Sequence, residues 1–359
     1  MERVAVPTGR PIVAKIGSSS LVGASGGIDR ARLDGFVAQV EGLRAAGHPV
    51  IVVTSAAIAA GLPVLGLGER PKDVASLQVA AAVGQGALMA TYSAAFQAHG
   101  TVVAQVLLTK DVLANRGQYV HSRNALDQML ALGVVPIVNE NDTVVVDELR
   151  WGDNDRLAAI VSHLAGAGML VLLTDTPGLY SGDPSSDAAV ELISAVRHTD
   201  GILDEVARGG AGRFGSGGVA TKVAAARMAA WSGIPTVIGS SDEPDLLQRV
   251  VAGDNVGTWI EPHESGLSAR KLWIAFGLPS KGTLVVDPGA ERAIVGGGKS
   301  LLAVGVASST GTFEVGDAVE VESDDGRLLA KGVVRAGSEG LDLVDGPLVH
   351  RDDLVVLSA

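Results

Sequence analysis

The stretch Met169-Leu-Val-Leu-Leu-Thr174 decides the class of fold, because it places five apolar residues in a row before a threonine. A run this short and this apolar predicts a strand that is buried on both faces. Similar short runs lie at residues 11–16, 49–54, 101–108, 134–139 and 235–238. Buried strands of this kind are typical of the parallel sheet of an α/β protein.

Helical patterns fill the intervals between these strands. Asp29 and Asp73 stand where N-cap residues are expected, and the helices after them would end near Gly47 and Gly100. Further helices are predicted over residues 122–132, 154–165 and 219–232. The alternation predicts a three-layer α/β sandwich with a mainly parallel sheet. Right-handed crossovers would bring the carboxyl ends of the strands to one edge, where such sheets bind ligands.

The pattern changes after about Pro262, which predicts two domains in this chain of 359 residues. Helical periodicity vanishes, and short strands separated by glycine-rich turns take its place. These strands are predicted over residues 283–286, 318–322, 328–334 and 353–357. We therefore expect a first domain over residues 1–262, a linker over 263–280 and a small all-β domain over 281–359.

The composition excludes several classes of function. The chain has no cysteine, so disulfides, thiolate metal sites and cysteine nucleophiles are ruled out. Its seven histidines show no close metal-ligand spacing, and we expect no metal site built by the protein. The formal charge of −12 opposes broad binding to nucleic acids or anionic membranes. No apolar run reaches the ~18 residues of a membrane span, and we expect a cytoplasmic protein.

Two lysines occupy positions suited to a phosphate. Lys15 closes an apolar strand before a Gly-Ser loop, and Lys222 lies in the first turn of a predicted helix after Gly217 and Gly218. Backbone N–H groups at a helix start favour anions, and a lysine there adds a full charge. Phosphoryl transfer needs cations around the moving group, so two lysines on opposite sides could clamp it. The plainer interpretation is that both are surface lysines.

Two polar clusters follow predicted strands. Asn139-Glu-Asn-Asp142 and Gly152-Asp-Asn-Asp155 offer carboxylates that could orient the lysines, and amides that could recognise an amino acid. The second cluster could instead only cap a helix. Thr174 and Asp175 end the most hydrophobic strand, where they could contact a nucleotide or form a turn with an Asx hydrogen bond.

Two familiar motifs are matched only in part. Gly298-Lys-Ser resembles the end of a Walker A loop, but Ala293 stands where the first glycine is required. Gly215-x-Gly217-x-x-Ala220 resembles a dinucleotide fingerprint, but it follows a Gly/Arg loop rather than a strand. Neither motif therefore predicts a site.

Five segments, taken in order, resemble those of glutamate 5-kinases, which belong to the amino-acid kinase family. The segments are TSAAIAAG at 54–61, VVPIVNENDTV at 134–144, GDNDRLAA at 152–159, LLTDTPGLY at 172–180 and GSGGVATK at 215–222. Any one of them is a weak signal, but five in order are a strong one. The C-terminal region, which ends in VHRDDLVVL at 349–357, resembles a PUA domain.

The resemblance implies the fold of the amino-acid kinases and roles for particular residues. The ATP-binding set that it implies is Lys15, Thr174, Asp175, Ser216, Gly217, Gly218, Val219, Ala220, Thr221 and Lys222. Ser55, Asp142 and Asn154 would bind glutamate. Lys15 and Lys222 would stabilise the transferring phosphoryl group, and Asp155 would hold both lysines in place.

The resemblance also implies a reaction and its participants. ATP would phosphorylate the side-chain carboxylate of L-glutamate to give L-glutamyl 5-phosphate, the first step of proline biosynthesis. Mg²⁺ would accompany ATP. Proline is the implied feedback inhibitor, and the implied partners are further copies of the chain in a homo-oligomer and glutamate-5-semialdehyde dehydrogenase.

The sequence departs from the family pattern at two places. Ala56 stands where the family has glycine, so either a positive φ or room for a ligand is expected to matter there. The C-terminal domain is also shortened between Val334 and Val349, where the family usually has a longer helical insertion.

Three alternatives stay open at the level of sequence. Another kinase of the same fold, acting on acetylglutamate, carbamate or uridylate, would share most motifs. An RNA-binding protein is suggested by the PUA resemblance, but residues 281–359 carry seven Lys/Arg against thirteen Asp/Glu, a net charge of −6. A regulatory pseudokinase is suggested only by Ala56.

Overall fold

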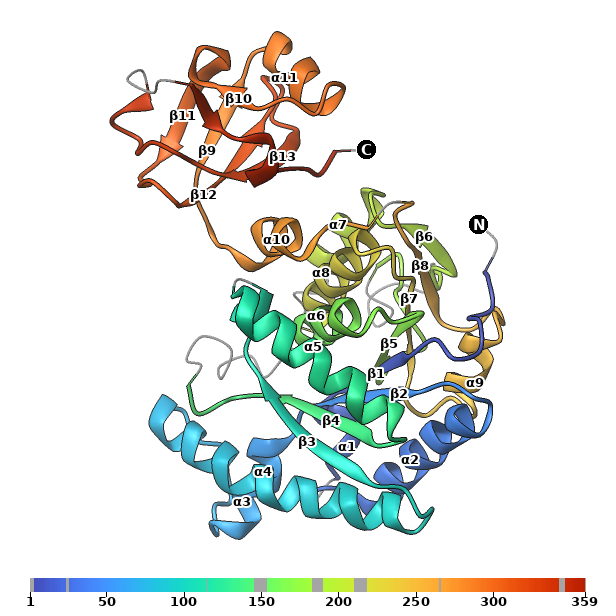
Figure 1. Cartoon of the computed structure of the whole chain (residues 1–359). Helices are drawn as coiled ribbons and strands as arrows, with labels where there is room; N and C mark the ends of the chain where they lie inside the picture. Colours follow the sequence, from blue (N-terminus) through green and yellow to red (C-terminus); the bar gives the residue numbers. More distant parts are fainter. Residues whose placement is uncertain are drawn as a thin grey trace. The chain divides into compact units, whose positions relative to one another are not determined.

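The computed structural model describes residues 3–23, 26–113, 115–144, 154–182, 190–209, 218–264, 266–341 and 346–358 (Figure 1). The chain divides into two compact units. The larger unit comprises Met1–Val112 and Arg116–Gly266, and the smaller comprises Leu113–Asn115 and Leu267–Ala359.

In the described part of the larger unit, eight strands form one sheet in the order β3-β4-β2-β1-β5-β7-β8-β6. Their bounds are β1 (Ile12–Ile16), β2 (Val50–Thr54), β3 (Val103–Leu108), β4 (Val135–Glu140), β5 (Met169–Thr174), β6 (Ala195–Arg197), β7 (Thr236–Ser240) and β8 (Thr258–Glu261). All neighbouring pairs are parallel except β7 with β8. The predicted mainly parallel sheet is therefore confirmed.

Helices cover both faces of this sheet. Their bounds are α1 (Ser18–Leu21), α2 (Arg30–Ala45), α3 (Ala57–Val64), α4 (Val74–Gln97), α5 (Arg116–Ala131), α6 (Asp155–Ala165), α7 (Ile202–Gly209), α8 (Gly218–Trp231) and α9 (Leu246–Val251), with a 3₁₀ turn η1 (Lys110–Leu113). Helices α2, α4 and α9 pack on one face, and α5, α6 and α8 pack on the other (Figure 1).

The alternation of side chains along β1 assigns each residue to a face. Ile12, Ala14 and Ile16 belong to the core shared with α2, α4 and α9. Val13 and Lys15 therefore point to the opposite face, where α6 lies against β1. Lys15 is only 3 % exposed, so this strand places a charged group inside the protein.

Helices α3 and α4 pack against each other through glycines. A Cβ on Gly84 would lie 1.8 Å from the carbonyl oxygen of Ala57, and a Cβ on Gly61 would lie 2.0 Å from that of Ala80. Both distances are far shorter than any contact between non-bonded atoms. The two helix backbones therefore lie so close together that only glycine fits at these positions. This contact fixes α3, whose first residues follow the carboxyl end of β2.

Gly84→Ala is expected to destabilise the protein by about 2–3 kcal/mol, because the added methyl group overlaps backbone atoms that cannot rotate away. Gly86→Ala is the matched control in the same helix, since nothing lies within 4 Å of its new Cβ. That change should be neutral or stabilise by about 0.5–1 kcal/mol. Urea unfolding of both variants measures the difference, and equal effects would contradict the close packing of α3 on α4.

Judged by length and composition alone, one helix in the described part of the chain, α4, could span a membrane. The side chains of Leu88, Tyr92 and Phe96 are fully buried in the core of the larger unit. Packing of α4 against the sheet and α3 thus accounts in part for the apolar character of this helix.

Most predicted elements are present, with shifted ends. Asp29 and Asp73 are N-cap residues whose carboxylates accept backbone hydrogen bonds, as predicted. Helix α5 begins six residues before the predicted start at Ser122, and its early turns are mostly exposed. The prediction missed α3, α7, α9, β6 and β8, which are eight residues long or shorter. Short elements carry too few residues to show a period.

The smaller unit contains a five-stranded sheet in the order β11-β9-β12-β13-β15 and a two-stranded pair of β10 with β14. The strands are β9 (Ser280–Val286), β10 (Leu301–Leu302), β11 (Val306–Gly311), β12 (Ala318–Glu322), β13 (Leu328–Val333), β14 (Pro347–Val349) and β15 (Leu354–Val356). The helical segments are α10 (Ala269–Leu272), the π-helical turn η3 (Trp273–Gly277), α11 (Pro288–Val295), η4 (Ala303–Gly305) and η6 (Arg351–Asp353).

One helix in the smaller unit corrects the expectation that helical patterns end at Pro262. Helix α11 begins with Pro288 at its first position, and the carboxylate of Asp287 accepts a 2.7 Å hydrogen bond from the backbone N–H of Ala290. An aspartate followed by proline is a standard start signal for a helix. The signal was present, but the helix is only eight residues long and buries only Ile294 completely.

Candidate active site

One buried carboxylate joins the two predicted lysines. Lys15 Nζ lies 2.5 Å from Asp155 Oδ1, and Lys222 Nζ lies 3.1 Å from Asp155 Oδ2. The Asp155 side chain is completely buried, and those of Lys15 and Lys222 are 4 % and 14 % exposed. The hydroxyl of Thr221 donates a further 3.2 Å hydrogen bond to Asp155 Oδ2. Neither lysine is therefore an ordinary surface residue.

Three elements position this cluster. Lys15 points from β1 toward the helix face that α6 covers, and Asp155 is the first residue of α6. Lys222 is the fifth residue of α8, slightly further along the helix than predicted, and α6 and α8 pack together. Two ammonium groups around one carboxylate leave one net positive charge. Such a cluster is suited to an incoming phosphate.

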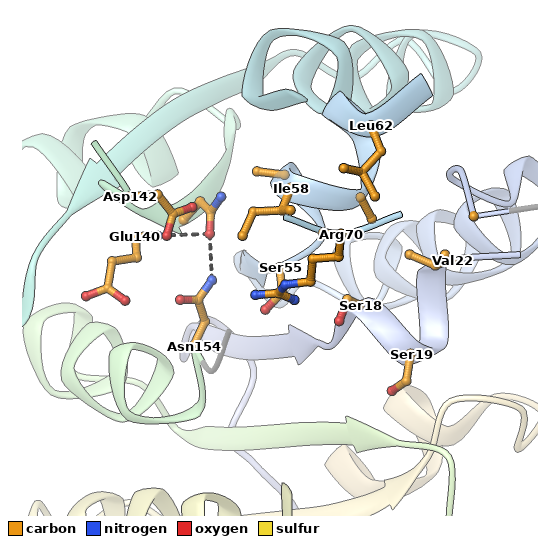
Figure 2. A pocket seen from close by; sticks show the side chains of 15 residues that line it. Ser18, Ser19, Val22, Ser55, Ile58, Leu62, Arg70, Glu140, Asp142 and Asn154 are labelled. Atoms are coloured by element: carbon orange, nitrogen blue, oxygen red, sulfur yellow. Dashed lines mark hydrogen bonds between the residues drawn. The ribbon is translucent and has the colours of Figure 1, made fainter. Parts of the chain in front are cut away.

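A cavity of about 380 Å³ opens at the carboxyl edge of the sheet (Figure 2). The residues that line it are Ser18, Ser19, Val22, Gly26, Ser55, Ala56, Ala57, Ile58, Ala59, Leu62, Arg70, Asn139, Glu140, Asp142 and Asn154. The three residues predicted to bind glutamate, Ser55, Asp142 and Asn154, all lie in this wall. Asn154 directly precedes Asp155, so the chain itself connects the cavity to the lysine cluster.

Asn154 occupies the N-cap position of α6, but its side chain does not cap the helix. Instead its amide nitrogen donates to the backbone carbonyl of Thr54 and, at 2.6 Å, to Oδ1 of Asn139. These two acceptors use both amide hydrogens, so Asn154 can offer a ligand only its carbonyl oxygen. The helix-cap interpretation of this cluster therefore does not hold for the side chains of Asn154 and Asp155.

A buried hydrogen-bond network holds Asn154 in this orientation. Asn139 donates at 2.8 Å to Gln85 Oε1 on α4, and its own Oδ1 also accepts from the backbone N–H of Glu140 at 2.9 Å. The hydroxyl of Thr54 is 2.9 Å from that of Tyr92 on α4, and burial raises the pKa of Tyr92. The network links α4 to the ends of β2 and β4, which fixes one wall of the cavity.

Ser55 follows β2 and points a hydroxyl toward the cavity (Figure 2). The residue is only 6 % exposed, and within the described residues its oxygen has no hydrogen-bond partner. A buried hydroxyl without a partner is costly, and a bound ligand would satisfy it. This atom supports a binding role for the cavity, independently of its shape.

The residues predicted to bind ATP fall into two groups. Thr174 and Asp175 are at the end of β5, where the hydroxyl of Thr174 donates to Asp175 Oδ1 at 3.0 Å. Strand β5 lies beside β1, which carries Lys15. Gly218, Val219, Ala220, Thr221 and Lys222 form the first turns of α8. Ser216 and Gly217 lie outside the described residues.

Ala56 adopts the left-handed conformation, with φ of 83° and ψ of 8°, immediately before α3. Of the two expected uses for a glycine at this position, the structure thus shows the positive φ. The alanine also lines the cavity, where it is 8 % exposed. A non-glycine residue in this conformation is strained by about 1–2 kcal/mol.

Ala56→Gly is expected to stabilise the protein by about 0.5–1 kcal/mol, because the relief of strain exceeds the extra entropy of glycine in the unfolded chain. Activity should change by less than about tenfold, since the cavity loses only a methyl group. Ala57→Gly, one residue further and inside α3, is the control and should destabilise by about 0.5–1 kcal/mol. Denaturant unfolding and kinase assays measure both effects. If the wild type is inactive and Ala56→Gly restores activity, the alanine is not accommodated at this position.

Sequence reasoning missed several residues of this site. Arg70 lines the cavity from the exposed segment between α3 and α4, and nothing in its local pattern marks it. Gln85 is hidden in an alanine-rich helix, although a buried polar residue in such a helix is itself a signal. Ser18 and Ser19 were expected in a Gly-Ser loop after Lys15 that was singled out only for its backbone, but the structure folds Ser18–Leu21 as helix α1, and both serines line the cavity.

The sheet, the lysine pair and the adjoining cavity define a small-molecule kinase of the amino-acid kinase type. The family model described as "Amino acid kinase family" matches residues 10–240, well over half of the chain, and the PUA domain model matches residues 282–351. The chain belongs to the amino-acid kinase family, and within it to the glutamate 5-kinases, as the following relatives show.

Curated relatives are similar over nearly their whole length. The glutamate 5-kinase of Marinomonas sp. strain MWYL1 is 45 % identical, over 96 % of this chain and 97 % of its own. Those of Streptomyces coelicolor and Nocardia farcinica are 43 % and 42 % identical, over 99 % and 98 % of this chain and 98 % of each relative. These identities favour a glutamate 5-kinase over the other kinases of the fold and over a non-catalytic PUA protein.

Among solved structures, a UMP kinase from Bacillus anthracis aligns with 73 % of this chain and 99 % of its own. The TM-score is 0.49 and the sequence identity 13 %, which is too low a similarity to bear on function.

Proposed function

We propose that this protein transfers the γ-phosphoryl group of ATP to the side-chain carboxylate of L-glutamate, giving L-glutamyl 5-phosphate and ADP. The observation that carries the proposal is the buried carboxylate of Asp155, which joins Lys15 and Lys222 beside the cavity. Curated glutamate 5-kinases, one of which is 45 % identical over nearly the whole chain, support the choice of glutamate as the acceptor. This reaction is the first step of proline biosynthesis.

The reaction needs no general base from the protein. The side-chain carboxyl group of glutamate has an ordinary pKa of about 4.3, so it is already ionised at neutral pH. A carboxylate oxygen attacks the γ-phosphorus, the bond from that phosphorus to the bridging oxygen breaks, and ADP leaves with those electrons. Asp155 therefore acts as a positioning residue for the two lysines rather than as a proton acceptor.

The two lysines act on the charge of the transferring group. Lys15 and Lys222 approach Asp155 from β1 and α8, so their ammonium groups are fixed before substrates arrive. Preorganised cations of this kind stabilise the transition state without reorganising. A hypothetical Cβ on Gly17 would lie 3.7 Å from Lys15 Nζ, so this ammonium group sits next to the loop that leads to Ser18 in the cavity wall.

Glutamate would bind with its ammonium group near Asp142 and the carbonyl oxygen of Asn154, because both accept hydrogen bonds. The hydroxyl of Ser55, which has no hydrogen-bond partner among the described residues, would donate to a substrate carboxylate. ATP would occupy the region bounded by Thr174, Asp175 and the start of α8. The choice of residues follows the family resemblance, and donor and acceptor chemistry supports the substrate group proposed for each.

Mg²⁺ would arrive with ATP. The described residues contain no group of three or more His, Asp or Glu side chains arranged to hold a metal ion. Nucleotide-bound Mg²⁺ is usually held mainly by phosphate oxygens and water. When bound, the ion neutralises charge on the phosphates.

Regulation and surroundings are proposed from the family. We infer that proline inhibits the enzyme, that copies of the chain form a homo-oligomer, and that the enzyme works in the cytoplasm. Glutamate-5-semialdehyde dehydrogenase would consume the product, an acyl phosphate that hydrolyses readily, and direct association would limit that loss. The net charge of −6 over residues 281–359 opposes RNA binding by the smaller unit.

The proposed function is tested by ADP release from Mg-ATP with L-glutamate, in parallel with trapping of the acyl phosphate by hydroxylamine. Glutamate-dependent hydroxamate should form in step with ADP, and proline should reduce both. N-acetylglutamate, carbamate and UMP serve as competing acceptors in the same assay. Turnover of one of these without turnover of glutamate would refute the substrate assignment, and ADP release without hydroxamate would refute carboxylate phosphorylation.

A further inference from the structure

The cavity wall carries an arginine to which the reaction chemistry above assigns no role. Arg70 lines the cavity together with Ser18, Ser55, Asp142 and Glu140. Figure 2 shows its side chain extending from the segment after α3 into the cavity, on the side opposite Asp142 and Glu140. Among the described residues that line the cavity, it is the one that carries a positive charge.

The charges of the cavity and of the proposed substrate do not balance without it. L-glutamate carries one ammonium group and two carboxylates. Asp142 and Glu140 are suited to the ammonium group, but both repel the α-carboxylate, which is attached to the same carbon atom. The buried Glu140 is only 7 % exposed, so water screens this repulsion poorly. A cation facing the two acidic residues would offset it.

Arginine is the side chain whose geometry suits this task. Its planar guanidinium group can bind a carboxylate through two parallel N–H···O hydrogen bonds, which a lysine cannot reproduce. The lysines of the site are already occupied, since Lys15 and Lys222 both bind Asp155 and serve the phosphoryl group. The α-carboxylate therefore needs a different partner.

The segment that carries Arg70 is anchored at both ends. Helix α3 is held against α4 by Gly61 and Gly84, and Asp73 caps α4 by accepting a 2.9 Å hydrogen bond from the backbone N–H of Ser76. Arg70 itself is exposed and lies three residues before that cap. A charged side chain at the mouth of a cavity, on an anchored segment, can reach a bound ligand and still exchange with solvent.

We propose that Arg70 binds the α-carboxylate of the amino-acid substrate and sets the preference for an acceptor with a charged α-carboxylate. This inference rests on the proposed function, and it adds a specificity residue to the residues predicted from sequence. It accounts for how a cavity with two acidic residues accepts a substrate that carries two negative charges.

The test compares L-glutamate with L-isoglutamine, which keeps the γ-carboxylate and the ammonium group but has a neutral amide in place of the α-carboxylate. Both compounds are measured as acceptors and as ligands by calorimetry, with the wild type and Arg70→Gln. Wild type should prefer glutamate. Arg70→Gln should weaken glutamate binding by about 10- to 100-fold, as expected for loss of a charge-assisted pair. Isoglutamine binding should change by less than about threefold.

Two further variants sharpen the result. Arg70→Lys should fall between wild type and Arg70→Gln, because it keeps the charge and loses the paired hydrogen bonds. Arg123→Gln is the matched control: this arginine is also exposed, lies on α5 and pairs with Asp127 at 3.8 Å. It should leave both ligands unaffected. Melting temperatures of all variants should agree, which separates binding from folding.

Each other outcome overturns the proposal in a recognisable way. Equal losses for both compounds would place Arg70 at the γ-carboxylate or the phosphoryl group. A variant that keeps the wild-type preference, or a wild type with no preference, would exclude a role in recognising the α-carboxylate. A wild type that turns over no glutamate would instead refute the proposed function itself, so the two failures are distinguishable.

Discussion

Replacing Asp155 with asparagine is expected to lower kcat by about 10³-fold or more, equivalent to ~4 kcal/mol of transition-state stabilisation. Asparagine has nearly the same shape, but it lacks the charge that holds Lys15 at 2.5 Å and Lys222 at 3.1 Å. Without that charge the two ammonium groups repel each other, and each moves away from the position it needs. Steady-state kinetics with saturating ATP and glutamate measures the loss.

The same substitution should also destabilise the free enzyme, because two cations would remain buried with no anion between them. Removing one partner from a buried ion pair typically costs about 3–5 kcal/mol. Mg-ATP should restore part of this loss, since its phosphates supply negative charge to the same lysines. Thermal melts with and without Mg-ATP show the effect as a larger ligand-induced rise in Tm than in the wild type.

Asp34→Asn is the matched control for this experiment. Asp34 also pairs with a cation, Arg30 at 2.8 Å on α2, but both side chains are 50 % exposed. Surface pairs contribute little, so stability and kcat should stay close to wild type. An Asp155→Asn enzyme with near-normal kcat would show that the lysines do not depend on Asp155 for their position.

The lysine cluster could be predicted because its members stand at the ends of regular elements. Lys15 interrupts an apolar strand, and Asp155 and Lys222 lie near the starts of two predicted helices. Parallel sheets bring such ends to one edge, so the pattern indicated that carboxylates of this region could orient the lysines. The particular role of Asp155 came from the family resemblance. The distances and the sharing of one carboxylate needed the structure.

The rest of the cavity wall, beyond the three residues that the family resemblance supplied, could not be predicted in the same way. Arg70 lies on the segment between α3 and α4, which pack through Gly61 and Gly84, and no local pattern reveals that contact. Gln85 supports Asn139 from 54 residues away, a pairing that depends on the position of α4 over the sheet. Periodicity shows which face of a helix is apolar, but not which polar group will meet it.

Lys222→Ala gives the second large effect, with kcat expected to fall about 10²–10³-fold, or roughly 3–4 kcal/mol. Charge on the phosphoryl oxygens is redistributed in the transition state, so the lysine acts there more than in the ground state. The apparent affinities for ATP and glutamate should therefore change far less than kcat. Measuring kcat and both KM values separately makes this distinction.

Stability separates this variant from Asp155→Asn. After Lys222→Ala the buried pair of Lys15 and Asp155 remains, with equal and opposite charges at 2.5 Å. No uncompensated charge is left, so the loss of stability should be well below the 3–5 kcal/mol of a broken buried pair. The two variants thus share a catalytic defect but differ in their melting temperatures. A large fall in both kcat and stability for Lys222→Ala would mean that this lysine mainly holds α8 against α6, and near-normal kcat would remove it from the mechanism.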